Sequence, residues 1–281
     1  MTKYEELLNN HSLHLKNDEI SKKTAAITSR FQENNTPEVL KFIYSCFDLT
    51  SLNKEDNAES IWKLVEGVNN FDGSKLDINN VAAICVFPNL VGTLKEALTA
   101  DVKIASVAGG FPASQTFIEV KIAETALAVA DGADEIHITL NSGLFFEQNY
   151  EEIVTEIQEL KDTCRDAVLK IILDAEVLKT LQNIKKAAIL STYSGADFVE
   201  ILVNANPDVV YVVCLAISEY YQLHDRKIGI KIFGKEQSME DILKYYTLLK
   251  EVLGEEWLSP DYFRIGATAS LTSMILNDNL L

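Results

Sequence analysis

Three ionisable side chains each stand among apolar neighbours in the sequence. His137 lies in IHI, Glu200 in VEIL and Lys231 in IGIKIF. Imidazole and carboxylate groups transfer protons, and an amine that has lost its proton can form an imine with a carbonyl carbon. Acid–base or imine chemistry is therefore the first hypothesis for these residues.

A structural interpretation fits the same residues. A buried carboxylate without a partner is costly, so Glu200 needs Lys231 or His137 beside it. If Glu200 pairs with Lys231, the ammonium form is favoured and Lys231 becomes a poor nucleophile. A cluster of three paired side chains explains these residues without any chemistry.

The elements that must position these side chains follow from the hydrophobic pattern. Short apolar runs alternate with helical stretches, which indicates parallel strands joined by crossover helices. Runs such as VAAICVF and LKIILD are apolar on both sides, as in strands covered inside and outside. The predicted strands are residues 42–48, 81–87, 103–107, 135–140, 168–174, 198–203, 228–233 and 263–266. Eight strands predict an α/β fold, a TIM-type eight-stranded β/α barrel, with an open doubly wound sheet as the alternative.

The helix expected at 116–130 is mostly apolar, with Glu119, Lys121 and Glu124 on its wetter side. After it, ADGAD at 130–134 places a glycine between helix and strand, and SGAD at 194–197 repeats this arrangement. Both glycines are expected to end a helix before a tight turn.

We expect one barrel over residues 41–281 and an N-terminal helical extension over residues 1–40 that caps it. The extension is polar and helix-compatible, and the sequence NNTP at 34–37 breaks it from the next helix. A length of 281 residues suits this division, because a β/α barrel takes about 250 residues.

Composition excludes several classes of function. The 42 acidic and 25 basic residues give a net charge of -17, which disfavours nucleic acid and anionic membranes as partners. No apolar stretch is long enough to span a bilayer, and residues 1–10 lack the core of a signal peptide.

Four widely spaced cysteines are predicted to be buried free thiols. We expect a soluble, cytoplasmic protein, and the lack of GxGxxG, P-loop, HExxH and GxSxG motifs predicts no cofactor.

Several segments in combination resemble deoxyribose-phosphate aldolase. They are FDLTSLN at 47–53, VAAICVFP at 81–88, GGFP at 109–112, KIAETALAVADGADEI at 121–136, LKIIL at 169–173, SGADF at 194–198, IGIK at 228–231 and FRIGA at 263–267. The resemblance runs in register from about residue 42 to the end. It implies a class I aldehyde-lyase barrel that acts on 2-deoxyribose 5-phosphate.

The resemblance also implies which side chains would react. In that family a lysine on strand six forms a Schiff base, a second lysine on strand seven lowers its pKa, and an aspartate on strand four moves protons. Glu200 stands at the position of the nucleophilic lysine and His137 at that of the aspartate, while Lys231 is retained. A carboxylate cannot form an imine, so the nucleophile of the family is missing.

The ligand-binding positions implied by the resemblance are partly kept. Asp48 and Thr50 match retained residues beside the site. Gly266 and Thr268 belong to a turn after strand eight that resembles a phosphate-binding element, and Lys235 could add positive charge. These five residues are the predicted contacts of a small anionic ligand.

We therefore expect a pseudoenzyme that has kept the aldolase scaffold and acts through ligand binding, a protein partner or assembly, as a homo-oligomer. One alternative is an enzyme of changed chemistry, with His137 or Glu200 as general base and Asp174 completing a metal site. It requires a barrel mouth that is not filled by Leu140, Phe145, Leu202 and Phe233. The other alternative is residual aldolase activity through Lys231.

Overall fold

The computed structural model describes residues 3–73, 77–234 and 237–268. Within them, eight parallel strands close into one barrel in the order β1 to β8. The strands are β1 (Phe47–Thr50), β2 (Ala83–Val86), β3 (Lys103–Ala108), β4 (Glu135–Thr139), β5 (Val168–Asp174), β6 (Phe198–Leu202), β7 (Gly229–Phe233) and β8 (Phe263–Ala267). The predicted TIM-type barrel is confirmed, and the open sheet is excluded because β8 pairs with β1.

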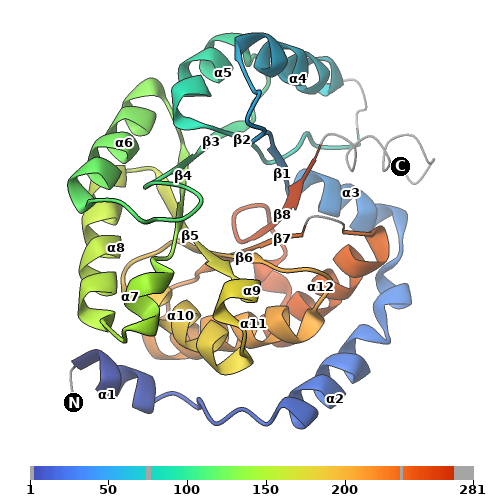
Figure 1. Cartoon of the computed structure of the whole chain (residues 1–281). Coiled ribbons are helices and arrows are strands. Elements are labelled where there is room, and N and C mark those ends of the chain that lie inside the picture. The colour runs from blue at the N-terminus through green and yellow to red at the C-terminus, as the bar shows by residue number, and fades with distance from the viewer. Residues whose placement is uncertain (1–2, 74–76, 235–236, 269–281) are drawn as a thin grey trace.

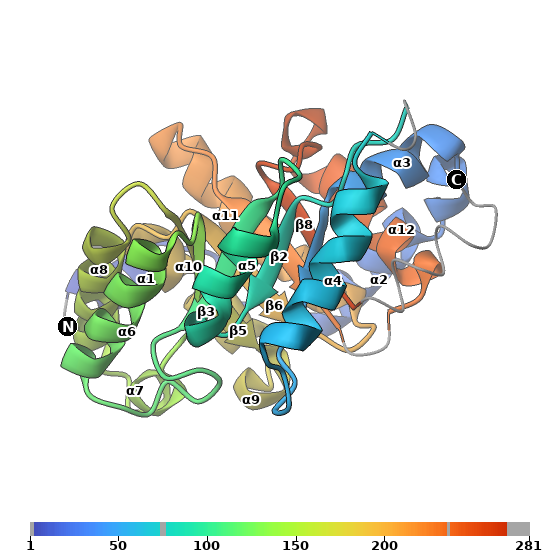
Figure 2. The same ribbon diagram turned by 90° about the horizontal axis from the view of Figure 1, so that it is seen from above.

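A layer of helices surrounds the strands (Figure 1). The crossover helices are α4 (Ala58–Phe71), α5 (Val91–Ala97), α6 (Ile118–Asp131), α8 (Tyr150–Cys164), α10 (Leu181–Tyr193), α11 (Pro207–His224) and α12 (Met239–Val252). Two short helices, α7 (Ser142–Phe146) and α9 (Ala175–Leu178), follow β4 and β5. Figure 2 shows α7 and α9 at the same end of the barrel, where the strands end. Among the described residues, no helix is long and apolar enough to cross a membrane.

Several local signals act as the sequence predicts. Gly132 ends α6 with a φ of 113°, and Gly195 follows α10 with a φ of 101°, both in a region that favours glycine. Thr36 caps α3 (Pro37–Ser45) by accepting a hydrogen bond from the Val39 amide. The first predicted strand is wrong at its start, because residues 42–45 belong to α3 and β1 begins at Phe47. All four cysteines are buried and free.

The polar side of α6 is predicted correctly for Glu119, which is exposed, and wrongly for Lys121. Lys121 is fully buried, where its ammonium group lies 2.7 Å from Glu156 and donates to Ser114. The outer face carries apolar side chains instead, and Phe117, Val120 and Leu127 are 78%, 50% and 66% exposed. A buried ion pair with α8 outweighs the simple rule that charges face water.

Strand alternation divides the barrel interior into two chemical halves. Side chains on one face of a strand recur every second residue, so each strand sends two or three into the interior. The β2 and β3 side is a small apolar cluster of Ala83, Cys85, Ala105 and Val107. The remaining strands direct ionisable side chains inward.

The N-terminal segment lies along the outside of the helical layer rather than over an end of the barrel. Helix α1 (Lys3–Asn9) contacts α8 and α10, and α2 (Asn17–Thr28) contacts α11 and α12 (Figure 1). The segment between α1 and α2 is held by Lys185 of α10. The buried ammonium group of Lys185 donates to the Ser12 carbonyl at 2.9 Å and lies 2.5 Å from Glu219. His11 reaches the other oxygen of Glu219 at 2.9 Å. Glu219 thus joins the extension to the barrel.

Replacing this carboxylate tests the anchor. Glu219→Ala leaves a buried ammonium without its counter-charge, so we expect the free energy of unfolding to fall by about 1–3 kcal/mol. Chemical denaturation measures the loss. Glu251→Ala is the matched control, because Glu251 is half exposed in its pair with Arg30 and should change stability by less than about 1 kcal/mol. Equal losses in the two variants would refute a buried anchor.

Candidate functional site

Seven ionisable side chains meet inside the barrel. They are Asp48 on β1, Glu135 and His137 on β4, Lys170 on β5, Glu200 on β6, Lys231 on β7 and Arg264 on β8. All are buried, with side chains no more than 5% exposed. The site expected from the sequence is therefore part of a larger charged network.

Glu200, His137 and Lys231 come together as predicted. The Lys231 ammonium lies 3.1 Å from Glu200 Oε1, and His137 Nδ1 lies 2.8 Å from Glu200 Oε2. The same imidazole nitrogen also lies 3.3 Å from the Lys231 ammonium nitrogen. Lys231 also lies 3.4 Å from Asp48, so two carboxylates surround its amine.

A second group of four residues lies beside this triad. Arg264 contacts Asp48 at 2.5 Å and Glu135 at 2.9 Å. Lys170 lies 3.0 Å from Asp48 and 2.7 Å from Glu135, with its ammonium 4.6 Å from the centre of the Phe198 ring. Glu135, Lys170 and Arg264 are not among the site residues that the sequence predicts. The signal was present, because each occupies an inward position of its strand: Lys170 is paired in register with His137 and Arg264 with Lys231.

Opposite charges balance in this network, which holds three carboxylates and three cations besides His137. Burial alone would raise the pKa of Glu200, but Lys231 and His137 lower it to about 2. For Glu135, burial is likewise outweighed by Lys170 and Arg264, and its pKa also falls to about 2. Burial opposes ionisation of Asp48 as well, yet Lys170 and Arg264 hold its pKa well below the ordinary value. All three acids are ionised near neutral pH.

The same pairing controls Lys231. Burial favours its neutral amine, but Glu200 and Asp48 reverse that effect and raise the pKa above the ordinary value of 10.5. A protonated amine has no lone pair to attack a carbonyl carbon. Lys231 is therefore held as an ammonium ion whose role is electrostatic.

The barrel mouth is narrow on the side of β5 to β7. A cavity of about 90 Å³ lies there, lined by Asp174, Glu176, Leu202, Val203, Asn204 and Phe233. The Phe233 ring packs against the backbone of Gly266, where a Cβ atom would overlap it. Gly266 thus makes room for an aromatic ring. Leu140 and Phe145, which follow β4 in the chain, are also buried.

Among the predicted anion contacts, Asp48 on β1 lies in register with Gly266 on β8. Asp48 is held in the ion network, and the Thr50 hydroxyl donates to the Asp48 carbonyl at 3.1 Å. Thr268 is exposed just beyond β8, while Lys235 lies outside the described residues. Gly266 is covered by Phe233.

The metal site suggested from the sequence is not formed. Asp174 caps α9 by accepting from the amides of Glu176 and Val177. A different group, Asp48, Glu135 and His137, has ligand atoms within 4.8 Å of one another. Its two carboxylates are already bonded to Lys170 and Arg264, so a divalent cation would have to displace two buried positive charges. The arrangement opposes metal binding.

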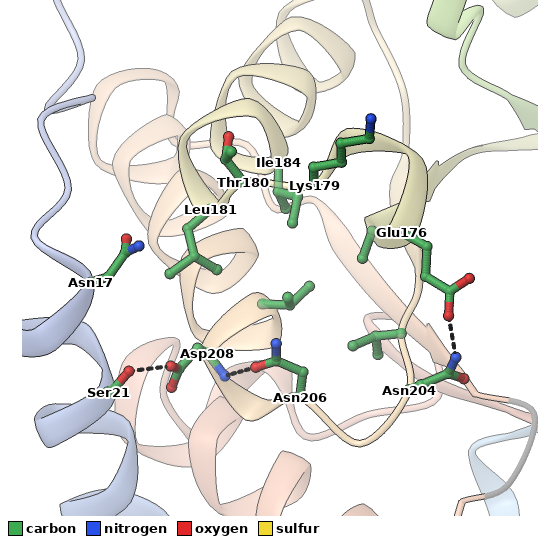
Figure 3. A pocket seen from close by; sticks show the side chains of 13 residues that line it. Asn17, Ser21, Glu176, Lys179, Thr180, Leu181, Ile184, Asn204, Asn206 and Asp208 are labelled. Carbon is green, nitrogen blue, oxygen red and sulfur yellow. Dashed lines mark hydrogen bonds between the residues drawn. The ribbon is translucent and has the colours of Figure 1, made fainter.

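A larger pocket of about 450 Å³ opens beside the mouth cavity (Figure 3). The loops after β5 and β6 form two walls, and α2 forms the third. Glu176, Val203 and Asn204 line both cavities, and a hydrogen bond of 2.5 Å from the Asn204 amide to Glu176 lies between them. This pocket is not predicted from the sequence, because its walls come from segments far apart in the chain.

Comparison with known proteins identifies related chains. The family described as DeoC/LacD family aldolase matches residues 42–221. Human deoxyribose-phosphate aldolase is 35% identical over 247 residues, which cover 81% of this chain and 76% of the human one. The bovine deoxyribose-phosphate aldolase is 34% identical over 250 residues, or 82% and 77% of the two chains. A solved structure described as the unique tetrameric structure of deoxyribose phosphate aldolase from Aeropyrum pernix superposes with a TM-score of 0.66 at 20% identity, covering 91% of this chain and 98% of the other.

The network predicts a loss of stability in acid. Glu135 and Glu200 have folded pKa values of about 2 against an ordinary value of 4.5. Each therefore stabilises the fold fully above pH 4.5 and loses that contribution as pH falls towards 2. We expect Glu200→Gln to be less stable at pH 7, by on the order of 3 kcal/mol, and to show a shallower loss between pH 4.5 and 2.

Denaturant titrations at several pH values measure both effects. Glu240→Gln serves as the control, since Glu240 is an exposed partner of Lys244 and its loss should cost less than about 0.5 kcal/mol. An unchanged acid slope in Glu200→Gln would contradict the low pKa assigned to Glu200.

Proposed function

Because the chain belongs to the deoxyribose-phosphate aldolase family, we propose that it is a member that has lost cleavage of 2-deoxyribose 5-phosphate and now acts by binding. The observation that carries this proposal is the ion pair between Glu200 and Lys231 at 3.1 Å. The family resemblance puts the Schiff-base lysine at the position of Glu200. A carboxylate paired with the remaining lysine provides neither a nucleophile nor a free amine.

No other lysine of the described barrel interior is suited to replace it. Lys170 is fully buried and lies within 3.0 Å of both Asp48 and Glu135. An imine requires the amine to reach a carbonyl carbon, and the burial of Lys170 within its ion pairs opposes that step.

The small size of the mouth cavity supports the same proposal. A small-molecule site typically has a volume of about 300–1,000 Å³, and the mouth cavity near β5 to β7 has about 90 Å³. Phe233 also covers the glycine that the resemblance places in the phosphate-binding turn. Substrate binding is opposed together with the chemistry.

The alternative of changed chemistry has one observation in its favour. A carboxylate 2.8 Å from an imidazole, as in Glu200 and His137, is a common way to orient a general base. However, His137 is only 1% exposed, and its partners complete a balanced ion network. We therefore assign the pair a structural role.

An aldolase assay with imine trapping tests the proposal. The wild-type protein should neither cleave 2-deoxyribose 5-phosphate nor form a borohydride-reduced adduct with acetaldehyde, as read by intact mass. Glu200→Lys restores an amine beside two cations that favour its neutral form, so this variant should form the adduct. Leu202→Lys, which places a lysine at the partly exposed mouth, controls for nonspecific imines. Wild-type turnover, or an adduct mapped to Lys231, would overturn the proposal.

We also propose that the chain assembles with copies of itself. The relative from Aeropyrum pernix is described as tetrameric. In this chain, Phe117, Val120 and Leu127 form an exposed apolar stripe on α6, and large exposed apolar side chains in a row favour an interface. A homo-oligomer would cover the stripe by symmetry.

Light scattering after size-exclusion chromatography tests the assembly. Leu127→Glu should shift the protein to a smaller assembly, because it places a charge in the apolar stripe. Leu223→Glu is the matched control, since Leu223 is 67% exposed on α11, away from the stripe. A monomeric wild type, or the same shift in both variants, would count against this surface.

A further inference from the structure

The pocket beside the mouth has the position and size of a ligand site. Its walls are the loops after β5 and β6, and in β/α barrels the loops that follow the strands carry the binding sites. Its volume of about 450 Å³ lies within the usual range for small molecules. The volume of the mouth cavity lies below that range, so the neighbouring larger pocket is the better candidate for a ligand site.

The N-terminal helix α2 forms the third wall of this pocket. Asn17 and Ser21 face the loops from α2, and the Ser21 hydroxyl donates to Asp208 at 2.5 Å (Figure 3). Ile20 and Thr24 are buried on the same helix, and Glu219 anchors the preceding segment through Lys185. The wall is therefore held in place before any ligand binds.

The lining combines an apolar floor with polar groups at the rim. The floor consists of Leu181, Ile184, Val203 and Val209. At the rim, the side chains of Asn17 and Lys179 make no hydrogen bond within the described part of the chain. Asn206 uses its carbonyl oxygen to cap α11, which leaves its amide hydrogens available. Unused donors around an apolar floor suit a ligand that has both a carbon skeleton and several acceptors.

The charges of the pocket select against anions. Glu176 and Asp208 contribute two carboxylates and Lys179 one ammonium group, in a chain of net charge -17. A phosphate group would face more negative than positive charge. Asn17 offers both an amide donor and a carbonyl acceptor, and Asn206 offers amide donors, which together can bond to hydroxyl groups. An uncharged molecule with several hydroxyl groups matches this lining.

The bond between Asn204 and Glu176 lies where the two cavities meet, since both side chains line both cavities. Glu200 and Lys231 are not among the residues that line the larger pocket. Binding there therefore does not require chemistry in the ion network.

We propose that the pocket between α2 and the loops after β5 and β6 binds a small uncharged polyhydroxylated molecule of the sugar class. This inference deepens the binding role proposed above and rests on it. The N-terminal extension is then part of the ligand site.

A non-reducing sugar derivative tests the pocket without imine chemistry. Titrating methyl β-D-glucopyranoside into the wild-type protein should shift the side-chain amide NMR signals of Asn17, Asn204 and Asn206. Ser21→Trp fills the pocket from α2 and should weaken binding by about tenfold or more. Ala26→Trp, at an exposed position of the same helix, should leave the affinity unchanged.

A second variant guards against misfolding of the first. Asn17→Leu removes one rim amide at an exposed position and should also weaken the glycoside. Inorganic phosphate, titrated in parallel, should produce smaller shifts at the same amides. The inference fails if the glycoside causes no shifts, if Ser21→Trp binds as the wild type does, or if phosphate binds more tightly. Wild-type aldolase turnover would refute the proposed function alone, since the titration does not depend on catalysis.

Discussion

Charge balance in the barrel interior is the constraint on which the remaining structure depends. Asp48, Glu135 and Glu200 face Lys170, Lys231 and Arg264 in a space that excludes water. Ions of this kind are tolerated in a protein interior only when each has a partner at close range. A substitution at one of these positions therefore changes the protonation and packing of several others.

Glu200 shows how such a network can redirect a site. If its position held a lysine, as in the family resemblance, the interior would carry additional positive charge, and neighbouring cations would favour a neutral amine. With a carboxylate there, Lys231 gains a direct partner and remains an ammonium ion. The side chain at this position thus decides whether Lys231 has a carboxylate partner. His137 completes the arrangement, with its Nδ1 atom 2.8 Å from Glu200 Oε2.

Much of the fold could be read from the sequence because strands and helices differ in period. The run LKIILD coincides with β5 at Val168–Asp174, and Gly132 ends α6 as expected. The start of β1 was misjudged, because Phe42 in α3 is as apolar as a strand residue. Lys121 was placed on the wrong side of α6, since its partner Glu156 comes from α8 and no local pattern reveals it.

The candidate site was only partly accessible from the sequence. Glu200, His137 and Lys231 stood out as ionisable residues in apolar runs, and they do meet. Lys170 and Arg264 could have been found by extending the alternation of their strands across the barrel. The pocket beside α2 could not, because Ser21 and Asp208 are 187 positions apart and only the packing of α2 on α11 joins them.

The contact between Phe233 and Gly266 couples residue size on two neighbouring strands. A Cβ atom at position 266 would overlap the Phe233 ring, so any larger residue there would require a smaller side chain at position 233. The two positions therefore limit each other's side-chain volume, and a substitution at one is expected to be tolerated only together with a compensating change at the other.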